Sequence, residues 1–222
     1  LTPHVLAAVN SEVDASTATA KGVVGAFESF HKCFPSDLSN GVLVHGCGAV
    51  GKIVASELVQ KGFKTYVVDK DVSKTNIEGT ISLGDDANWY KNKFDVLFPC
   101  SISGLINTYN ASFLLDKKAI IPAANAPFIN EIIPKKLKEA NLTIIPDPLV
   151  NAGAVIGDSI ERYAPHEWSK ATSEKVYEFV KDSVRNKCFA FLSLIQSGLT
   201  SEETLELIQN EQDTIIGKTF LA

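Results

Sequence analysis

Residues 42–51, which read VLVHGCGAVG, constrain the fold more than any other segment. A short run of β-branched and apolar residues predicts a buried strand, and the glycines then follow the G-x-G-x-x-G spacing of a turn that opens a helix. In such a turn the first glycine permits the bend, the second lets the backbone approach a pyrophosphate, and the third lets the helix pack against the strand. Backbone N–H groups at the helix start then bind the phosphates. The predicted dinucleotide-binding residues of this turn are Gly46, Gly48, Ala49, Val50 and Gly51.

The segment that follows the turn supports this prediction. A helix is expected over residues 52–61, Gly62 is a plausible helix end, and a strand over residues 65–68 leads into Asp69, 18 residues beyond Gly51. This is close to the spacing of roughly 20 residues at which an acidic side chain binds the ribose 2′-hydroxyl. Because a carboxylate there repels a 2′-phosphate, NAD is favoured over NADP. Lys70, next to Asp69, is included in the predicted site. The alternative is a glycine turn in some other α/β protein.

Strands and helices alternate along most of the chain. Apolar runs predict further strands at 94–98, 118–121 and 142–145, each followed by a proline. Amphipathic spacing predicts helices near 16–34 and at 134–141, 151–163, 168–196 and 201–212, and residues 70–84 are expected to form a short helix or a loop. This order predicts an α/β fold with a doubly wound, mostly parallel sheet of Rossmann type and a C-terminal helical extension. We expect residues 1–163 to form the dinucleotide-binding domain and residues 164–222 to extend the same domain.

Composition excludes several classes of partner. The net charge of −5 gives no basis for binding nucleic acid or an anionic membrane, and no apolar run approaches the length of about 18 residues needed to span a bilayer. The four cysteines are scattered without a C-x-x-C pair, so we expect no metal site and reduced thiols in the cytoplasm. The chain contains no methionine and begins with leucine, which we interpret as a sign of a fragment or a trimmed chain.

Two asparagines follow successive predicted strands near the carboxyl edge of the sheet, where ligands bind in folds of this class. Asn125 lies in the loop 122–127 and Asn151 in the segment 146–156. A neutral amide donates and accepts hydrogen bonds at once, which suits a carboxamide such as nicotinamide. The alternative is that both asparagines satisfy the backbone of turns.

Five segments, in one order along the chain, resemble motifs of the amino-acid dehydrogenases that act on glutamate, leucine, phenylalanine and valine. They are Thr17–Val23, Gly46–Gly51, Asp95–Asn107, Ala124–Pro127 and Pro146–Val155. The last two are similar to the family's A-N-G-P and P-D-x-x-x-N-A-G-G-V motifs. The resemblance implies the family's Rossmann-type C-terminal domain, NAD as the cofactor, and reversible oxidative deamination of an L-amino acid to a 2-oxo acid and ammonia. It also implies a small-molecule substrate and a homo-oligomer.

The resemblance also assigns roles by motif position. It implies that Thr19 contacts the cofactor and that Asp69 binds the adenosine ribose. Pro99 and Cys100 would line the cofactor near the ribose and pyrophosphate, and Asn125 and Asn151 would face the nicotinamide end. For Cys100 a packed small side chain is favoured over a nucleophile, because nothing near it in the sequence would lower its pKa.

The chain departs from the family pattern at several positions. Ala126 and Ala154 stand where the motifs have glycine, and each adds a methyl group where backbone approaches a ligand. Lys21 stands where the family often has tyrosine or arginine. The family's catalytic lysines and aspartate belong to an N-terminal substrate domain, which we expect to be absent here because no glycine-rich lysine segment occurs. The catalytic residues therefore stay unknown.

Two other functions stay open on this basis. One is a regulatory or sensor module that binds NAD and has no chemistry of its own. The other is a different NAD-linked enzyme whose catalytic residues come from another subunit.

Overall fold

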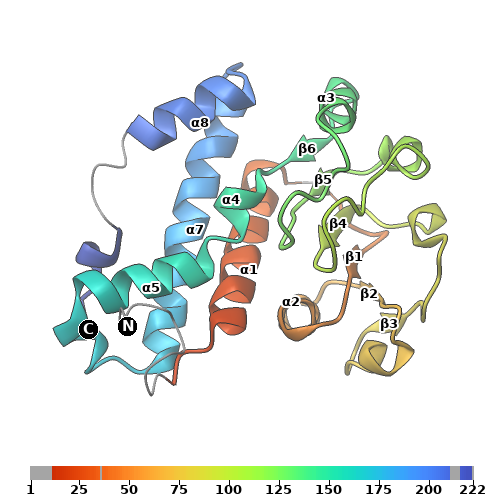
Figure 1. The fold of residues 1–222 in the computed structure, drawn as a ribbon. Coiled ribbons are helices and arrows are strands. Elements are labelled where there is room, and N and C mark those ends of the chain that lie inside the picture. Colours follow the sequence, from red (N-terminus) through yellow and green to blue (C-terminus); the bar gives the residue numbers. More distant parts are fainter. Residues whose placement is uncertain (1–11, 36, 211–215, 222) are drawn as a thin grey trace. The chain divides into compact units, whose positions relative to one another are not determined.

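The computed structural model describes residues 12–35, 37–210 and 216–221 (Figure 1). Contacts divide the chain into two compact units, of which one is Ser36–Asn151 and the other combines Leu1–Pro35 with Ala152–Ala222. The expected assignment of residues 164–222 to the same domain as the sheet stays a prediction. Each unit has its own architecture and is described separately.

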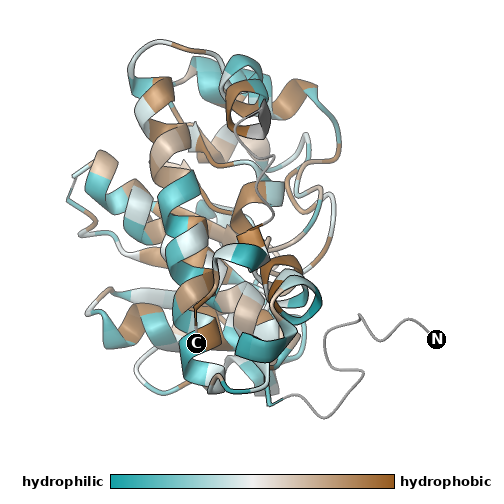
Figure 2. Ribbon diagram, turned by 90° about the vertical axis from the view of Figure 1, so that its left-hand side faces the viewer, coloured by the Kyte–Doolittle hydropathy of each residue, from teal (hydrophilic) through white to brown (hydrophobic). Residues whose placement is uncertain are grey.

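The unit formed by the two ends of the chain is helical. Its elements are α1 (Ala15–Cys33), α5 (Gly153–Tyr163), α6 (Pro165–Trp168), α7 (Ser173–Gln196), α8 (Ser201–Asn210) and a 3₁₀ turn η4 (Ile216–Thr219). The hydropathy colouring of Figure 2 shows hydrophobic and hydrophilic residues interspersed along the helices, as expected of amphipathic segments. In α7, Val176, Val180, Val184 and Cys188 recur every four residues and are buried.

Helices α1 and α7 pack closely because small residues lie between their backbones. A Cβ added at Gly25 would meet the carbonyl oxygen of Lys181, so only glycine fits there. Ser29 Oγ donates a hydrogen bond to the Arg185 carbonyl oxygen at 2.6 Å, and the Arg185 guanidinium lies 3.6 Å from the Glu28 carboxylate. None of the helices in the described ranges is both long and apolar enough to cross a bilayer.

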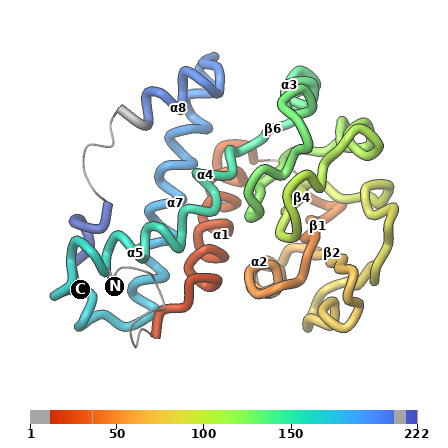
Figure 3. The backbone as a smooth tube through the Cα atoms, in the orientation of Figure 1, coloured from red at the N-terminus to blue at the C-terminus, as the bar shows by residue number. Residues whose placement is uncertain are grey.

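The other unit is built on a sheet, which has six strands in the described residues and the order β3-β2-β1-β4-β5-β6. The strands are β1 (Val42–His45), β2 (Thr65–Val68), β3 (Ile81–Ser82), β4 (Val96–Pro99), β5 (Ala119–Ile120) and β6 (Thr143–Ile144). All neighbouring strands are parallel. Figure 3 shows the chain running from β1 through α2 to β2. This strand order is that of a doubly wound dinucleotide-binding sheet, so the predicted fold class is confirmed.

Helices and short turns connect these strands. They are α2 (Ala49–Gln60), α3 (Ile132–Glu139), α4 (Asp147–Val150), η1 (Val72–Thr75), η2 (Trp89–Lys91) and η3 (Ala111–Leu114). The expectation that residues 70–84 form only a short helix or loop was incomplete, since β3 lies there. Ile81 and Ser82 of β3 are exposed, so this two-residue edge strand has no apolar burial pattern that the sequence could reveal.

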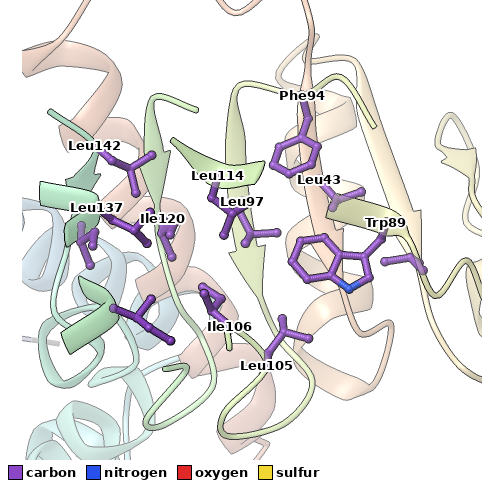
Figure 4. Close-up of a cluster of buried hydrophobic side chains, with 13 residues drawn as sticks. Leu43, Trp89, Phe94, Leu97, Leu105, Ile106, Leu114, Ile120, Leu137 and Leu142 are labelled. Atoms are coloured by element: carbon purple, nitrogen blue, oxygen red, sulfur yellow. The ribbon is translucent and has the colours of Figure 1, made fainter. Parts of the chain in front are cut away.

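The hydrophobic core of this unit includes side chains that lie next to one another on one face of β1, β4 and β5. Leu43 is opposite Leu97 in the β1–β4 register, and Leu97 is opposite Ile120 in the β4–β5 register. Figure 4 shows Trp89, Phe94 and other apolar side chains gathered with these three residues. Because Val42, Leu43 and Val44 are all fully buried, β1 is covered on both faces. This burial fixes β1 in the sheet and thereby fixes the start of the glycine turn.

Candidate dinucleotide-binding site

The candidate site lies at the carboxyl ends of β1, β2 and β4. Strand β1 pairs with β2 on one side and β4 on the other, so the three strand ends are neighbours. His45 is opposite both Val68 and Pro99 at this edge. The loops that begin at Gly46, Asp69 and Cys100 therefore leave the sheet side by side, as ligand-binding loops do in doubly wound folds.

The three glycines of the turn have different roles. Gly46 has φ +96°, and an added Cβ there would lie 2.6 Å from the Ser101 Cβ and 2.7 Å from its Cα. A Cβ at Gly51 would meet the Gly46 carbonyl oxygen and lie 3.1 Å from the Cys100 Cβ. A Cβ at Gly48 has nothing within 4 Å. Gly46 and Gly51 are thus required by packing within the protein, while Gly48 faces open space that suits the close approach of a pyrophosphate.

Helix α2 begins directly at this turn. Gly48 is its N-cap, and the Lys52 N–H donates the first helical hydrogen bond to the Gly48 carbonyl oxygen at 3.0 Å. The N–H groups of Ala49, Val50 and Gly51 have no carbonyl group in a preceding helical turn to bind. No side chain caps the helix start. These N–H groups and the helix dipole make the start of α2 a suitable place for phosphate oxygens.

Asp69 is fixed by two backbone N–H groups from different loops. Its Oδ2 accepts a hydrogen bond from the Cys47 N–H at 2.7 Å, and its Oδ1 accepts one from the Asp71 N–H at 2.9 Å. A carboxylate oxygen accepts two hydrogen bonds, so each oxygen keeps capacity for a ribose hydroxyl. The sequence pattern predicted the ribose role but missed the bond to Cys47, which joins Asp69 to the glycine turn itself. Lys70, beside Asp69, is exposed.

Burial keeps His45, Cys47 and Cys100 at this edge in their neutral forms. It lowers the pKa of His45 from 6.5 to about 4, and the His45 Nδ1 lies 2.8 Å from the Ser101 Oγ. Burial and the neighbouring Asp69 carboxylate raise the pKa of Cys47 to about 11. Burial also raises the pKa of Cys100 far above its usual range, which supports a packed thiol rather than a nucleophile. His45 was not predicted as part of this edge, because an isolated histidine in a sequence has no distinguishing pattern.

Pro99 and the two asparagines belong to the adjoining part of the same edge. The Pro99 carbonyl oxygen accepts hydrogen bonds from the N–H groups of Ala123 and Ala124, both at 2.9 Å. Asn151 Nδ2 donates to the Ala123 carbonyl oxygen at 3.2 Å and to Asn125 Oδ1 at 2.7 Å. The structure therefore brings the two predicted asparagines into direct contact, 26 residues apart in the chain.

The contact with a backbone carbonyl fixes which way the amides point. Because the Ala123 carbonyl can only accept, Asn151 must direct its NH₂ group there, and Asn125 must direct its oxygen to the same NH₂. Asn125 Nδ2 and Asn151 Oδ1 then point away from the contact. The pair thus keeps one amide donor and one amide acceptor that are not used in this contact, and a primary carboxamide needs one of each.

Thr19 belongs to the helical unit, where its Oγ1 donates to the Ala15 carbonyl oxygen at 2.9 Å. Its cofactor contact stays a prediction. In the same unit, a Cβ added at Gly153 would meet the Ala18 carbonyl oxygen and lie 2.8 Å from the Thr19 Cα. This glycine of the N-A-G motif is therefore required for packing of α5 on α1. No cluster of three or more metal-binding side chains occurs within residues 12–35, 37–210 and 216–221.

Comparison with known proteins agrees with this geometry. The family model for Glutamate/Leucine/Phenylalanine/Valine dehydrogenase matches residues 64–210. The chain belongs to this family. A phenylalanine dehydrogenase from Caldalkalibacillus thermarum is 32% identical over 165 residues, which are 69% of this chain and 44% of the relative. A phenylalanine dehydrogenase from Lysinibacillus sphaericus is 28% identical over 165 residues, or 69% of this chain and 43% of that protein.

Solved structures show the same fold. The L-tryptophan dehydrogenase from Nostoc punctiforme superposes with a TM-score of 0.74 at 22% identity, covering 90% of this chain and 61% of that one. The chain spans less than half the length of the two phenylalanine dehydrogenases. The predicted family is confirmed by the match of the family model to residues 64–210.

Proposed function

We propose that this chain supplies the NAD-binding domain of an amino-acid dehydrogenase, which oxidatively deaminates an L-amino acid to a 2-oxo acid and ammonia. Family membership supports the reaction class. The observation that carries the proposal is the turn from Gly46 to Gly51, in which two glycines are required by packing while the third faces open space. That arrangement is the one a bound pyrophosphate requires.

The protein groups at the sheet edge would each bind one part of the dinucleotide. The N–H groups at the start of α2 would hold the pyrophosphate, and Asp69 would accept hydrogen bonds from the adenosine ribose. A fixed carboxylate repels a 2′-phosphate, which is the physical reason to propose NAD rather than NADP. The amides of Asn125 and Asn151 would bind the nicotinamide carboxamide and so fix the orientation of its ring.

The bound nicotinamide would supply the hydride-transfer chemistry. The groups of this chain described above bind and orient the dinucleotide, and none of them is proposed as the general base. Thr19 is proposed as a further cofactor contact from its place in the family motif. A homo-oligomeric state and a cytoplasmic location are also part of the proposal, and light scattering of the purified chain tests the first of these.

An activity assay tests the reaction class. The purified 222-residue chain is incubated with NAD and a panel of L-amino acids, including phenylalanine, valine, tryptophan and glutamate, and NADH is followed by absorbance. NADH formation that depends on the amino acid supports a dehydrogenase. Binding of NAD without turnover is expected of a cofactor domain that needs a further catalytic segment, and also of the alternative sensor module. If the gene encodes residues before this chain, repeating the assay with them included distinguishes these two, because only the dehydrogenase would then gain turnover.

A further inference from the structure

Ala126 has a backbone conformation that an alanine seldom adopts. Its φ is +45°, in the left-handed region where the Cβ of an L-residue is crowded. In the described residues the other non-glycine with positive φ is Asn141, a residue type that tolerates this region well. A strained alanine persists only where the surrounding contacts hold it in place.

Two hydrogen bonds hold Ala126 in this conformation. Its N–H donates to Asp147 Oδ2 at 2.9 Å, and its carbonyl oxygen accepts from the Gly104 N–H at 2.8 Å. The first bond comes from a side chain and can be removed by substitution, whereas the second joins two backbone groups. Asp147 thus opposes the tendency of Ala126 to return to a relaxed conformation.

The same short segment also holds the neighbouring asparagine. Asp147 begins α4 and Asn151 caps its end, with the Asn151 N–H bonded to the Asp147 carbonyl oxygen at 2.9 Å. Asp147 contacts the backbone at residue 126, and Asn151 contacts the side chain of Asn125. Asn125 itself is exposed, so its orientation depends on these contacts. Ser103 Oγ also donates a hydrogen bond to the backbone carbonyl oxygen of Asn125 at 2.8 Å.

We propose that Asp147 is a positioning residue for the nicotinamide end of the site. Its carboxylate holds the Ala126 N–H and thereby keeps the Asn125 amide directed at the carboxamide. Asp147 touches neither the proposed pyrophosphate site nor Asp69 through any contact described above. Its effect is therefore confined to the nicotinamide half of the dinucleotide. This inference rests on the proposed function.

A comparison of NAD with ADP-ribose isolates this effect. ADP-ribose lacks the nicotinamide ring of NAD but keeps its adenosine and its pyrophosphate. Calorimetry of the 222-residue chain gives both dissociation constants for wild type, Asp147→Ala and Asp147→Asn. We expect Asp147→Ala to weaken NAD about five- to tenfold and to leave ADP-ribose within about twofold. Asp147→Asn keeps an oxygen that accepts the Ala126 N–H, so it is expected to restore most of the NAD affinity. Asp147→Ser is the second truncation if the alanine variant does not fold.

A double-mutant cycle with Asn125→Ala tests the route of the effect. If Asp147 acts through Asn125, the loss on truncating Asp147 largely disappears once Asn125 is alanine. Equal weakening of NAD and ADP-ribose in Asp147→Ala, or no weakening of either, overturns the inference and leaves the proposed function intact. Failure of the wild-type chain to bind either ligand instead overturns the proposed function and the inference with it.

Discussion

Alanine substitutions at Gly48 and Gly51 add the same methyl group at two positions of one turn, three residues apart. We expect Gly51→Ala to lower folding stability and Gly48→Ala to weaken ligand binding. At Gly51 the new Cβ would meet the Gly46 carbonyl oxygen and the Cys100 Cβ. At Gly48 it would meet nothing within 4 Å. The pair therefore separates a glycine required by the fold from a glycine required by the ligand.

The Gly51→Ala variant should lose folding stability. The atom in the way is a backbone oxygen of the turn, which cannot move unless the turn itself moves. Overpacking of this kind costs about 3 kcal/mol. For a chain of 150–250 residues each kcal/mol corresponds to roughly 2–4 °C, so we expect the Tm to fall by about 6–12 °C.

The Gly48→Ala variant should keep its stability and lose its ligand. Gly48 has φ −70° and ψ −164°, which alanine adopts without strain. The reduced freedom of the unfolded chain contributes about 0.4–1 kcal/mol of stability, and the poorer N-cap costs about 0.5–1 kcal/mol, so the two nearly cancel. The methyl group would occupy the space proposed for the pyrophosphate, and we expect NAD and ADP-ribose to bind at least about tenfold more weakly.

Thermal melting measures the Tm of both variants, and calorimetry on the same samples measures their affinity for NAD. The expected pattern is a Tm within about 2 °C of wild type and weak binding for Gly48→Ala, with a clear Tm loss for Gly51→Ala. Wild-type NAD affinity in Gly48→Ala would refute the proposed pyrophosphate position. An unchanged Tm in Gly51→Ala would refute the packing argument.

Three further outcomes follow from the site. Asp69→Ala should weaken NAD and also lower the Tm, because it removes the acceptors of the Cys47 and Asp71 N–H groups; unchanged affinity would refute the ribose role. Burial lowers the pKa of His45 to about 4. As the pH falls below 6.5, His45 therefore takes up a proton in the unfolded chain but stays neutral in the folded chain. The free energy of unfolding should therefore decrease between pH 6.5 and about 4, by up to about 1.4 kcal/mol per pH unit. Denaturant titrations at several pH values should show a smaller decrease for His45→Gln than for wild type. An equal decrease in both proteins would contradict a neutral, buried His45 ring. Ellman's reagent should react slowly with Cys47 and Cys188, which are buried in the folded chain, and rapidly with all four thiols after unfolding; rapid labelling of Cys47 or Cys188 in the folded chain would contradict their burial.

Local patterns in the sequence predicted the part of the fold that carries the site. The strand 65–68 was predicted at its observed bounds, because its β-branched residues lie between a helix end and an acidic residue. The helix after the turn begins at Ala49 rather than Lys52, since Gly48 already serves as its N-cap. β3 escaped prediction because two exposed residues at a sheet edge leave no apolar pattern.

Contacts between distant residues were predictable only in part. Asn125 and Asn151 follow successive predicted strands and were expected at one edge of the sheet, and they are hydrogen-bonded. No role in the site was predicted for Asp147 from the sequence. Its bond to Ala126 depends on the left-handed backbone at that alanine, which no single sequence reveals.

Calorimetric titration of the wild-type chain with NAD, and then with NADP, tests the central claim most directly. The account predicts a single NAD site and an affinity for NADP at least about tenfold lower, because the Asp69 carboxylate repels a 2′-phosphate. Absence of NAD binding by the folded chain would contradict the assignment of this sheet edge as a dinucleotide site. Equal affinity for NAD and NADP would contradict the role given to Asp69.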